Sequence, residues 1–265
     1  MLRKENALWW NKRTLATQII IWLIIINAMV ALVLFVVPNV TNEGLRQQIA
    51  HELIHHGIVT GTLVFTPVTV ANMGLSMFFL LSGMAMLIGA VIIAHDSILK
   101  ERETGTAAWL LSKPLSRKSF VLAKMLANGF GMMIIVLFIQ GIIAYAMCSI
   151  ELGHPVTVLP FLTGLGFMGL DVLFYLILAM VLGAFSLSRG VVLGLPIVFG
   201  LIGGELLTLL PDLGHYMPWS LGSMAQAAAI GTPLSSIDLL PASSTTIWIL
   251  LFIAVAVWRF DGIEL

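Results

Sequence analysis

Residues 96–124 read DSILKERETGTAAWLLSKPLSRKSFVLAK, and this is the longest polar, charge-bearing segment of the chain. It lies between two apolar runs, as a loop on one side of a membrane protein does. Its parts follow a specific order: an acidic–basic–acidic cluster at 101–103, Thr-Gly-Thr at 104–106, an apolar turn at 107–111 and Ser-Lys-Pro at 112–114. Because a passive tether needs only polarity, these breaks and caps indicate a folded docking element.

The composition places the chain in a membrane. Of its 265 residues, 59% are hydrophobic and 10% are charged, whereas a soluble domain carries about 25% charged residues. The formal net charge is zero, so the basic footprint of a nucleic-acid-binding protein is absent. The single cysteine, Cys148, excludes an internal disulfide.

Six apolar segments are long enough to cross a hydrocarbon core of about 30 Å, which takes roughly 20 helical residues. Backbone groups in lipid must pair within their own segment, so all six are predicted to be helices. The predicted spans cover 15–38, 70–94, 120–150, 161–187, 191–210 and 241–258. The sequence therefore predicts an all-α membrane protein with one transmembrane domain over residues 1–265.

Three further elements are predicted beside the spans. Leu8, Trp9 and Trp10 stand among basic residues, which predicts an interfacial helix over 1–14 with its apolar face toward the membrane. The loop 96–119 is predicted to contain a cytoplasmic coupling helix. The connection 211–244 is apolar and contains four prolines, so short re-entrant helices are predicted on the outer side before the last span.

The distribution of Lys and Arg sets the orientation. Of the 13 such residues, all but Arg46 fall in the N-terminal tail, in the 96–124 stretch, between spans four and five, or in the C-terminal tail. These four regions share one side of the membrane if there are six spans. Both termini are therefore predicted to be cytoplasmic, in a multi-pass protein of the cell (inner) membrane.

The segment His51-Glu52-Leu53-Ile54-His55 matches the HExxH pattern of zinc proteases. Two histidines four residues apart share a helix face and can bind zinc, with the glutamate as base. A catalytic site needs a third protein ligand, and neither His154 nor His215 has a spacing that supports it. The favoured interpretation is the polar face of an outer amphipathic helix, with a membrane-embedded zinc metalloprotease using His51 and His55 as the alternative.

Polar residues inside the predicted spans form a second set of candidates. Asp171 lies near the middle of span four and Glu205 in the outer part of span five. A carboxylate at such depth is expensive and faces the bundle interior or a wet cavity. Two interpretations stay open: a substrate or ion path, with Gln140 as a further member, or a structural carboxyl group, ionised or protonated, bonded to a neighbouring helix, for example to Gln140 or Tyr145.

Span five also carries Gly190-x-x-x-Gly194 and Gly200-x-x-x-Gly204. Small residues four apart let helix backbones approach closely. Packing inside one bundle and packing between subunits are both open.

The 96–124 stretch resembles the cytoplasmic loop of type-2 ATP-binding-cassette (ABC) transporter permeases. That loop reads Glu-basic-Glu-x-Gly-Thr, a short apolar turn, Ser-x-Pro-x-Ser-Arg and a later Lys. The matching positions here are Glu101, Arg102, Glu103, Gly105, Thr106, Leu110, Leu111, Ser112, Pro114, Ser116, Arg117 and Lys124. The six spans, the amphipathic start, the broken outer segment and the basic-acidic tail from Arg259 fit the family as well, although the tail has one basic residue where two are frequent.

The resemblance implies a mechanism. A separate ATPase chain, carrying ATP and Mg, would dock on the loop, and two ATPase copies would serve a pair of permeases. Gly105 would let the helix leaving span two turn sharply, the apolar turn at 107–111 would enter a groove on the ATPase, and Ser116 would cap the helix of span three. Glu101, Glu103 and Arg117 would fix the register.

The function expected from the resemblance is that of the permease subunit of an ABC exporter, which forms its path as a dimer with itself or a related chain. No phosphate-binding loop of the form G-x-x-x-x-G-K-[ST] occurs in the sequence. The chain itself is therefore expected to be neither an enzyme nor a cofactor-binding protein. Besides the zinc protease, a non-transporting ABC mechanotransmission subunit is an alternative.

Overall fold

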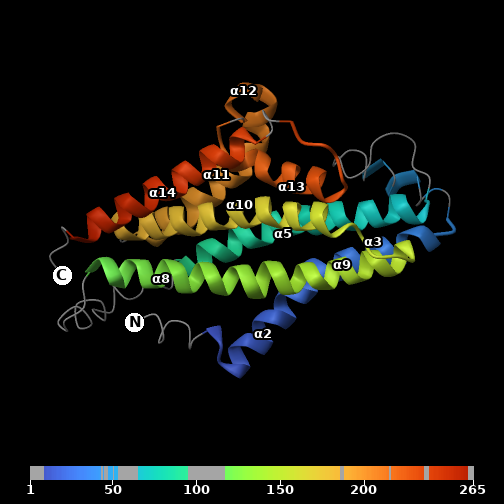
Figure 1. Ribbon diagram of the computed structural model, residues 1–265, viewed down its shortest axis with the longest axis horizontal. Coiled ribbons are helices and arrows are strands. Elements are labelled where there is room, and N and C mark those ends of the chain that lie inside the picture. The colour runs from blue at the N-terminus through green and yellow to red at the C-terminus, as the bar shows by residue number, and fades with distance from the viewer. Residues whose placement is uncertain are drawn as a thin grey trace.

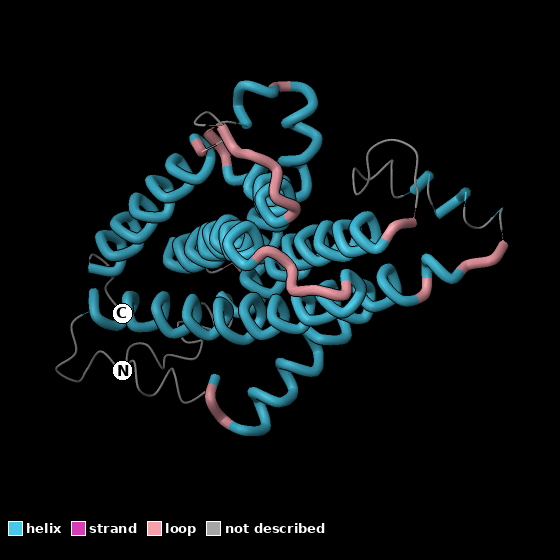
Figure 2. The backbone as a smooth tube through the Cα atoms, turned by 45° about the vertical axis from the view of Figure 1, so that its right-hand side comes forward, coloured by secondary structure: helices cyan, strands magenta, loops and turns pink. Residues whose placement is uncertain are grey.

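A computed structural model describes residues 9–42, 44, 47–49, 51–52, 65–94, 117–185, 188–214, 216–235 and 239–261. Within these ranges every regular element is helical and no strand occurs, which Figure 2 shows along the backbone. The predicted all-α class is confirmed.

Six helices of the described part are long and apolar enough to cross a membrane, as predicted. The first consists of α2 (Lys12–Trp22), the π-helix η1 (Leu23–Asn27), α3 (Ala28–Phe35) and the short 3-10 helix η2 (Val37–Asn39). The second is α5 (Pro67–Ala94). The third consists of α8 (Arg117–Gly131), the π-helix η4 (Met132–Phe138) and α9 (Ile139–Leu152). The last three are α10 (Val158–Phe185), α11 (Arg189–Leu209) and α14 (Leu240–Asp261).

Helix α10 forms the centre of the bundle. It lies along α5, with the α8–α9 helix on one side and α11 and α14 on the other (Figure 1). In its most apolar stretch 78% of the residues are buried, compared with 17% in α11 and 22% in α14. Lipid tails are as apolar as leucine side chains, so the exposed apolar faces of α11 and α14 suit a membrane environment.

Small residues let the inner helices pack closely. A Cβ atom on Gly169 of α10 would lie 2.6 Å from Cε of Met133, and one on Gly129 of α8 would lie 3.2 Å from a methyl carbon of Leu173. Glycine at such crossings accepts the neighbouring side chain where no other residue leaves room. The third span therefore packs closely on α10 because a side chain of each helix lies against a glycine of the other.

Three short helices connect α11 to α14: α12 (Pro211–Gly214), the 3-10 helix η5 (Pro218–Ser220) and α13 (Leu221–Ala229). Helix α13 packs against α10 and α5 and is followed by Gly231, whose φ of 81° lies in the left-handed region that favours glycine. Short helices thus occur where the sequence predicts them, and their re-entrant placement stays a prediction.

Candidate functional site

The predicted docking loop lies largely outside the described residues. Residues 95–116 belong to that part, so the structure says nothing of Glu101, Arg102, Glu103, Gly105, Thr106, Leu110, Leu111 or Pro114. The structure does describe the frame that holds the loop: α5 ends at Ala94, and α8 begins at Arg117. In Figure 1 these two ends lie toward the same end of the bundle as the end of α14.

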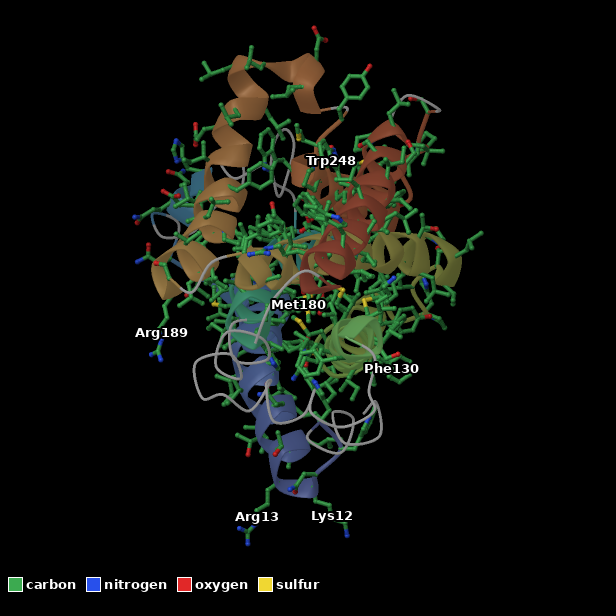
Figure 3. The ribbon with its side chains drawn as sticks, turned by 90° about the vertical axis from the view of Figure 1, so that its left-hand side faces the viewer. Lys12, Arg13, Phe130, Met180, Arg189 and Trp248 are labelled. Atoms are coloured by element: carbon green, nitrogen blue, oxygen red, sulfur yellow. The ribbon has the colours of Figure 1, made fainter. Side chains whose placement is uncertain are left out.

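Basic residues of the described part gather at this end of the helices. Lys12 and Arg13 begin α2, Lys118 lies in the first turn of α8, and Arg189 begins α11. Figure 3, seen from this side, shows Lys12, Arg13 and Arg189 pointing away from the bundle. In α14 the basic residue, Arg259, lies in the last turn. Such one-sided placement is the pattern of a charged membrane face.

Asp171 lies inside the bundle on α10 and is 9% exposed. No described residue forms a hydrogen bond or an ion pair with its carboxyl group. Tyr175 lies one helical turn further along the same face and is close enough for electrostatic interaction with Asp171. The structure therefore brings a carboxyl and a phenol together within the span.

The suggested structural partners of Asp171 bind elsewhere. The side-chain amide of Gln140 receives a 2.7 Å hydrogen bond from Asn27 and donates to the carbonyl oxygen of Ile19 at 3.3 Å. The Tyr145 hydroxyl donates to the carbonyl oxygen of Val156 at 2.8 Å. The interpretation in which Gln140 or Tyr145 holds the Asp171 carboxyl is therefore wrong.

A cluster of aromatic rings starts at Tyr175, one helical turn from Asp171. The ring of Tyr175 packs edge-on against Phe174 at 5.2 Å between centroids and lies 6.4 Å from Phe199 of α11. Phe199 in turn lies 4.9 Å from Trp219 of η5, and Phe174 lies 5.8 Å from Phe252 of α14. Four elements thus contribute rings to one wall of the bundle.

Gly200 of the predicted small-residue pattern explains how α11 reaches this wall. A Cβ atom there would lie 2.1 Å from Cδ1 of Leu87 and 3.2 Å from the Tyr175 hydroxyl oxygen. A Cβ on Gly194 or Gly204 would meet no atom within 4 Å. Within the described part, Gly200 therefore serves packing inside the bundle, while Gly194 and Gly204 face open space.

Helices α10 and α13 meet along a seam. A Cβ atom on Gly164 would lie 2.6 Å from the carbonyl oxygen of Ala225 and 3.1 Å from Cβ of Ala229. Asp171 lies two helical turns from Gly164, about 10 Å along α10. Two turns back from Ala225, past the start of α13, lies η5. Asp171 and Trp219 of η5 are therefore at about the same height along the bundle.

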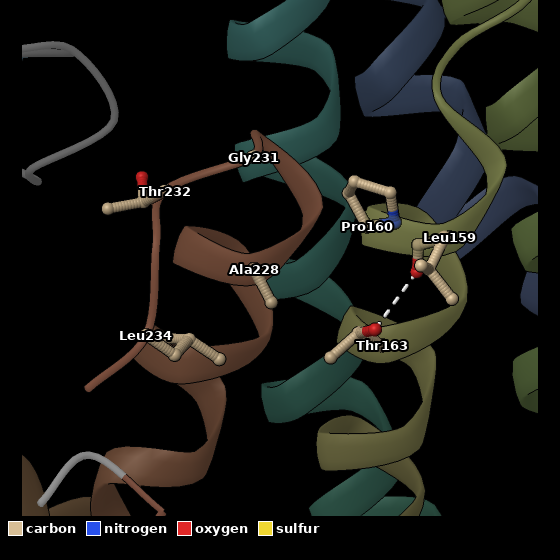
Figure 4. Close-up of a pocket in the computed structure, with 7 residues that line it drawn as sticks. All are labelled: Leu159, Pro160, Thr163, Ala228, Gly231, Thr232 and Leu234. Atoms are coloured by element: carbon tan, nitrogen blue, oxygen red, sulfur yellow. Dashed lines mark hydrogen bonds between the residues drawn. The ribbon is translucent and has the colours of Figure 1, made fainter. Parts of the chain in front are cut away.

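The end of this seam away from the basic residues opens into a pocket of about 230 Å³. Figure 4 shows its walls: the first turns of α10 on one side, and α13 with the irregular segment that follows it on the other. The lining residues are Leu159, Pro160, Thr163, Ala228, Gly231, Thr232 and Leu234. Along α10 the close contact at Gly164 lies between the pocket and Asp171.

A second polar group joins the first and third spans. Asn27, at the end of η1, donates to Gln140, which follows η4, and the Gln140 amide also lies 3.5 Å from the carbonyl oxygen of Ile135 within η4. In π-helices the backbone bonds to the fifth residue instead of the fourth, and such segments are frequent at functional sites. The two amides therefore link the irregular turns of both spans.

The residue Trp9 lies inside the bundle rather than in the predicted membrane interface. It is 8% exposed, and its indole nitrogen donates a 3.0 Å hydrogen bond to Oδ1 of Asn128. Its ring lies where a Cβ on Gly131 would be, 2.3 Å from the nearest ring atom. Trp10 is 43% exposed, and residues 1–8 lie outside the described part, so the interfacial helix stays a prediction.

The predicted membrane residues do not form a single site. Glu205 is exposed on α11, whereas Asp171 and Gln140 are buried in separate groups. Sequence reasoning missed Asn27 and Asn128, which are 3% and 6% exposed. An asparagine within an apolar run is the signal by which both could have been found.

Lys124 is a further buried polar residue, with 1% exposure and its ammonium group 5.3 Å from the centre of the Phe120 ring. Of the outer HExxH segment, His51 and Glu52 are described and exposed, while His55 lies outside the described residues. No group of three potential metal ligands occurs among the residues that the structure describes.

Comparison with known proteins links the chain to a transporter family. The family model described as "ABC-2 family transporter protein" matches residues 42–265. This range includes the docking loop, the seam and the aromatic cluster. No curated protein matches the chain.

Proposed function

The chain belongs to the ABC-2 family of transporter membrane proteins, and on this basis we propose that it is the permease subunit of an exporter driven by ATP hydrolysis on a separate chain. It is a multi-pass membrane protein with six apolar helices, and the members of its family are membrane components of transporters. The alternatives, a zinc protease and a mechanotransmission subunit, receive no support from the family match.

The observation that carries the proposal is the sequence motif at 96–124, which lies within the residues that the family model matches. The loop leaves α5 after Ala94 and enters α8 at Arg117. These two helices pack against other parts of the bundle, α5 against α10 and α9, and α8 against α14. A push on the loop by an ATPase would therefore reach the inner helices directly.

The third span is suited to transmit such a push. It runs from Lys118 to Leu152, 35 residues, which at 1.5 Å per residue is about 50 Å long. A hydrocarbon core is about 30 Å thick, so the helix extends well beyond it. We propose that the extension lies on the cytoplasmic side, where the basic residues gather, and that both termini lie there in the inner membrane.

A second subunit would use the faces that this chain leaves exposed. Helices α11 and α14 are the least buried spans, and Gly194 and Gly204 on α11 leave space at the helix surface. We propose that two permeases, identical or related, pair with two ATPase copies and enclose the path between them. ATP and Mg would bind to the ATPase chains.

Co-purification with the ATPase tests the proposal. Gly105→Val and Glu103→Arg change the turn and the register of the loop, so both are expected to release the ATPase while the permease still elutes as a folded species. Lys113→Ala, at a position that the family pattern leaves open, is the matched control and should retain the ATPase. Retention by all three variants would refute the docking role of the loop.

A further inference from the structure

Asp171 forms no ion pair with any residue that the structure describes. Helix α8, which also packs against α10, carries Lys124, whose ammonium group lies 5.3 Å from the centre of the Phe120 ring. Helices α5 and α13 contain no Lys, Arg or His at all. The basic residue of α11 is its first, Arg189, and that of α14 is Arg259 in the last turn. Both lie at the charged end of the bundle, whereas Asp171 lies in the middle of α10.

A buried carboxylate without a partner is costly, because its attraction to a cation must replace the water that it has lost. Two ways remain to lower this cost: protonation of the carboxyl group, or a positive charge supplied from outside the chain.

The surroundings favour an organic cation over a small hydrated ion. Tyr175 lies one helical turn from Asp171, and ring contacts lead from it to Phe199 and then to Trp219. Aromatic faces attract ammonium groups that have been stripped of water. The indole nitrogen of Trp219 is buried without a hydrogen-bond partner among the described residues. It is a spare donor on the same wall.

The position of the site also suits a transported molecule. Asp171 lies on the same face of α10 as Gly164, two helical turns further along, and the pocket at Thr163 and Thr232 lies beyond Gly164 in the other direction. The close approach of Gly164 to Ala225 lies between the two along α10. A small movement of α13 away from α10 would join the two.

We propose that Asp171, with the rings of Tyr175, Phe199 and Trp219, binds the ammonium group of the transported molecule, so that the substrates are amphipathic organic cations. The inference rests on the proposed function and names the substrate class of that transporter. The acid provides the opposite charge, the rings provide the apolar and cation–π surface, and the seam leads to the outer pocket.

The test uses phenyltrimethylammonium as the probe and benzenesulfonate as the anionic control of similar size. Binding of each to the full chain in lipid nanodiscs is measured by equilibrium dialysis at constant ionic strength. The wild type is expected to bind the cation saturably and the anion not at all. Asp171→Asn, which keeps the size and removes the charge, is expected to weaken cation binding at least about tenfold, a loss of ~1.4 kcal/mol.

Two further variants separate recognition from folding. Asp171→Glu keeps the charge and is expected to restore most of the affinity, while Phe199→Leu removes one ring and is expected to weaken binding about threefold to tenfold. Asp212→Asn changes an exposed acid of α12 and is the control that should bind as the wild type does.

Equal affinity of the wild type and Asp171→Asn would overturn the proposal, as would equal binding of the cation and the anion. Binding to the isolated chain needs no ATPase, whereas the docking test above needs no substrate. Failure of the cation to bind with retained ATPase docking would therefore reject the substrate class alone. Retention of the ATPase by both Gly105→Val and Glu103→Arg would reject the proposed function instead.

Discussion

The side-chain amide of Asn27 donates a 2.7 Å hydrogen bond to the amide oxygen of Gln140, which joins the first span to the third where both contain π-helical turns. Both residues are buried. Interhelical hydrogen bonds of this kind contribute about 0.6 kcal/mol on average and up to ~1.7 kcal/mol in membrane proteins. A double-mutant cycle with Asn27→Ala and Gln140→Ala is expected to give a coupling energy in this range, measured by unfolding in mixed micelles. A coupling energy near zero would contradict the pairing.

Trp9 is expected to stabilise the bundle through its indole nitrogen. Trp9→Phe keeps most of the ring but leaves Oδ1 of Asn128 without its donor, and an unsatisfied buried polar atom costs about 1–3 kcal/mol. The midpoint of thermal unfolding should fall accordingly. Trp10→Phe changes a ring that is 43% exposed and should leave the midpoint nearly unchanged; equal effects would place Trp9 outside the bundle.

Adjacent glycines on α11 are expected to respond differently to the same substitution. A Cβ atom on Gly203 would lie 2.0 Å from Cδ1 of Trp219, whereas one on Gly204 would meet nothing within 4 Å. Gly203→Ala should destabilise the protein by about 1–3 kcal/mol through overpacking. Gly204→Ala should be neutral or stabilise the helix by up to ~1 kcal/mol. Similar unfolding midpoints for the two variants would contradict the packing of η5 on α11.

The seam between α10 and α13 offers a test by transport. A Cβ on Gly164 would meet the backbone oxygen of Ala225 at 2.6 Å, while one on Gly166 would meet nothing within 4 Å. Gly164→Ala should therefore displace α13 and change the rate of efflux from vesicles that hold the permease and its ATPase. Gly166→Ala is the control. If both variants transport as the wild type does, α13 does not control the path.

The orientation in the membrane can be tested with single cysteines. In a Cys148→Ser background, His154→Cys places a thiol after α9, and Ser188→Cys places one between α10 and α11. A membrane-impermeant maleimide should label the first in intact cells and the second only after permeabilisation. The opposite pattern would reverse the predicted topology.

The sequence allowed the number of spans and the helical class to be predicted because apolar length and backbone pairing in lipid leave few other solutions. The burial of Asp171 followed from the cost of a charge in hydrocarbon. Its neighbours did not follow: Gln140 and Tyr145 are chemically suitable, but on α9 the first bonds with Asn27 and the second with the carbonyl oxygen of Val156.

Other features had no periodic signal in the sequence. The π-helical turns η1 and η4 arise in runs of Leu, Ile, Met and Val that read equally well as ordinary α-helix. The contact of Trp9 with Asn128 spans 119 residues, and no local pattern indicates such a pairing. Conversely, the docking motif at 101–117 is clear in the sequence and lies largely outside the described structure.

The packing of Trp9 against Gly131 bears on where a purification tag is placed. An affinity tag or fluorescent protein fused to the start of the chain would be joined within nine residues of a ring that packs against the third span. Such a fusion would disturb the helix that the 96–119 loop enters. The end of α14 lies near the start of α8 at the same end of the bundle (Figure 1), and α14 packs against α8, so a fusion placed after α14 would also stand close to the third span.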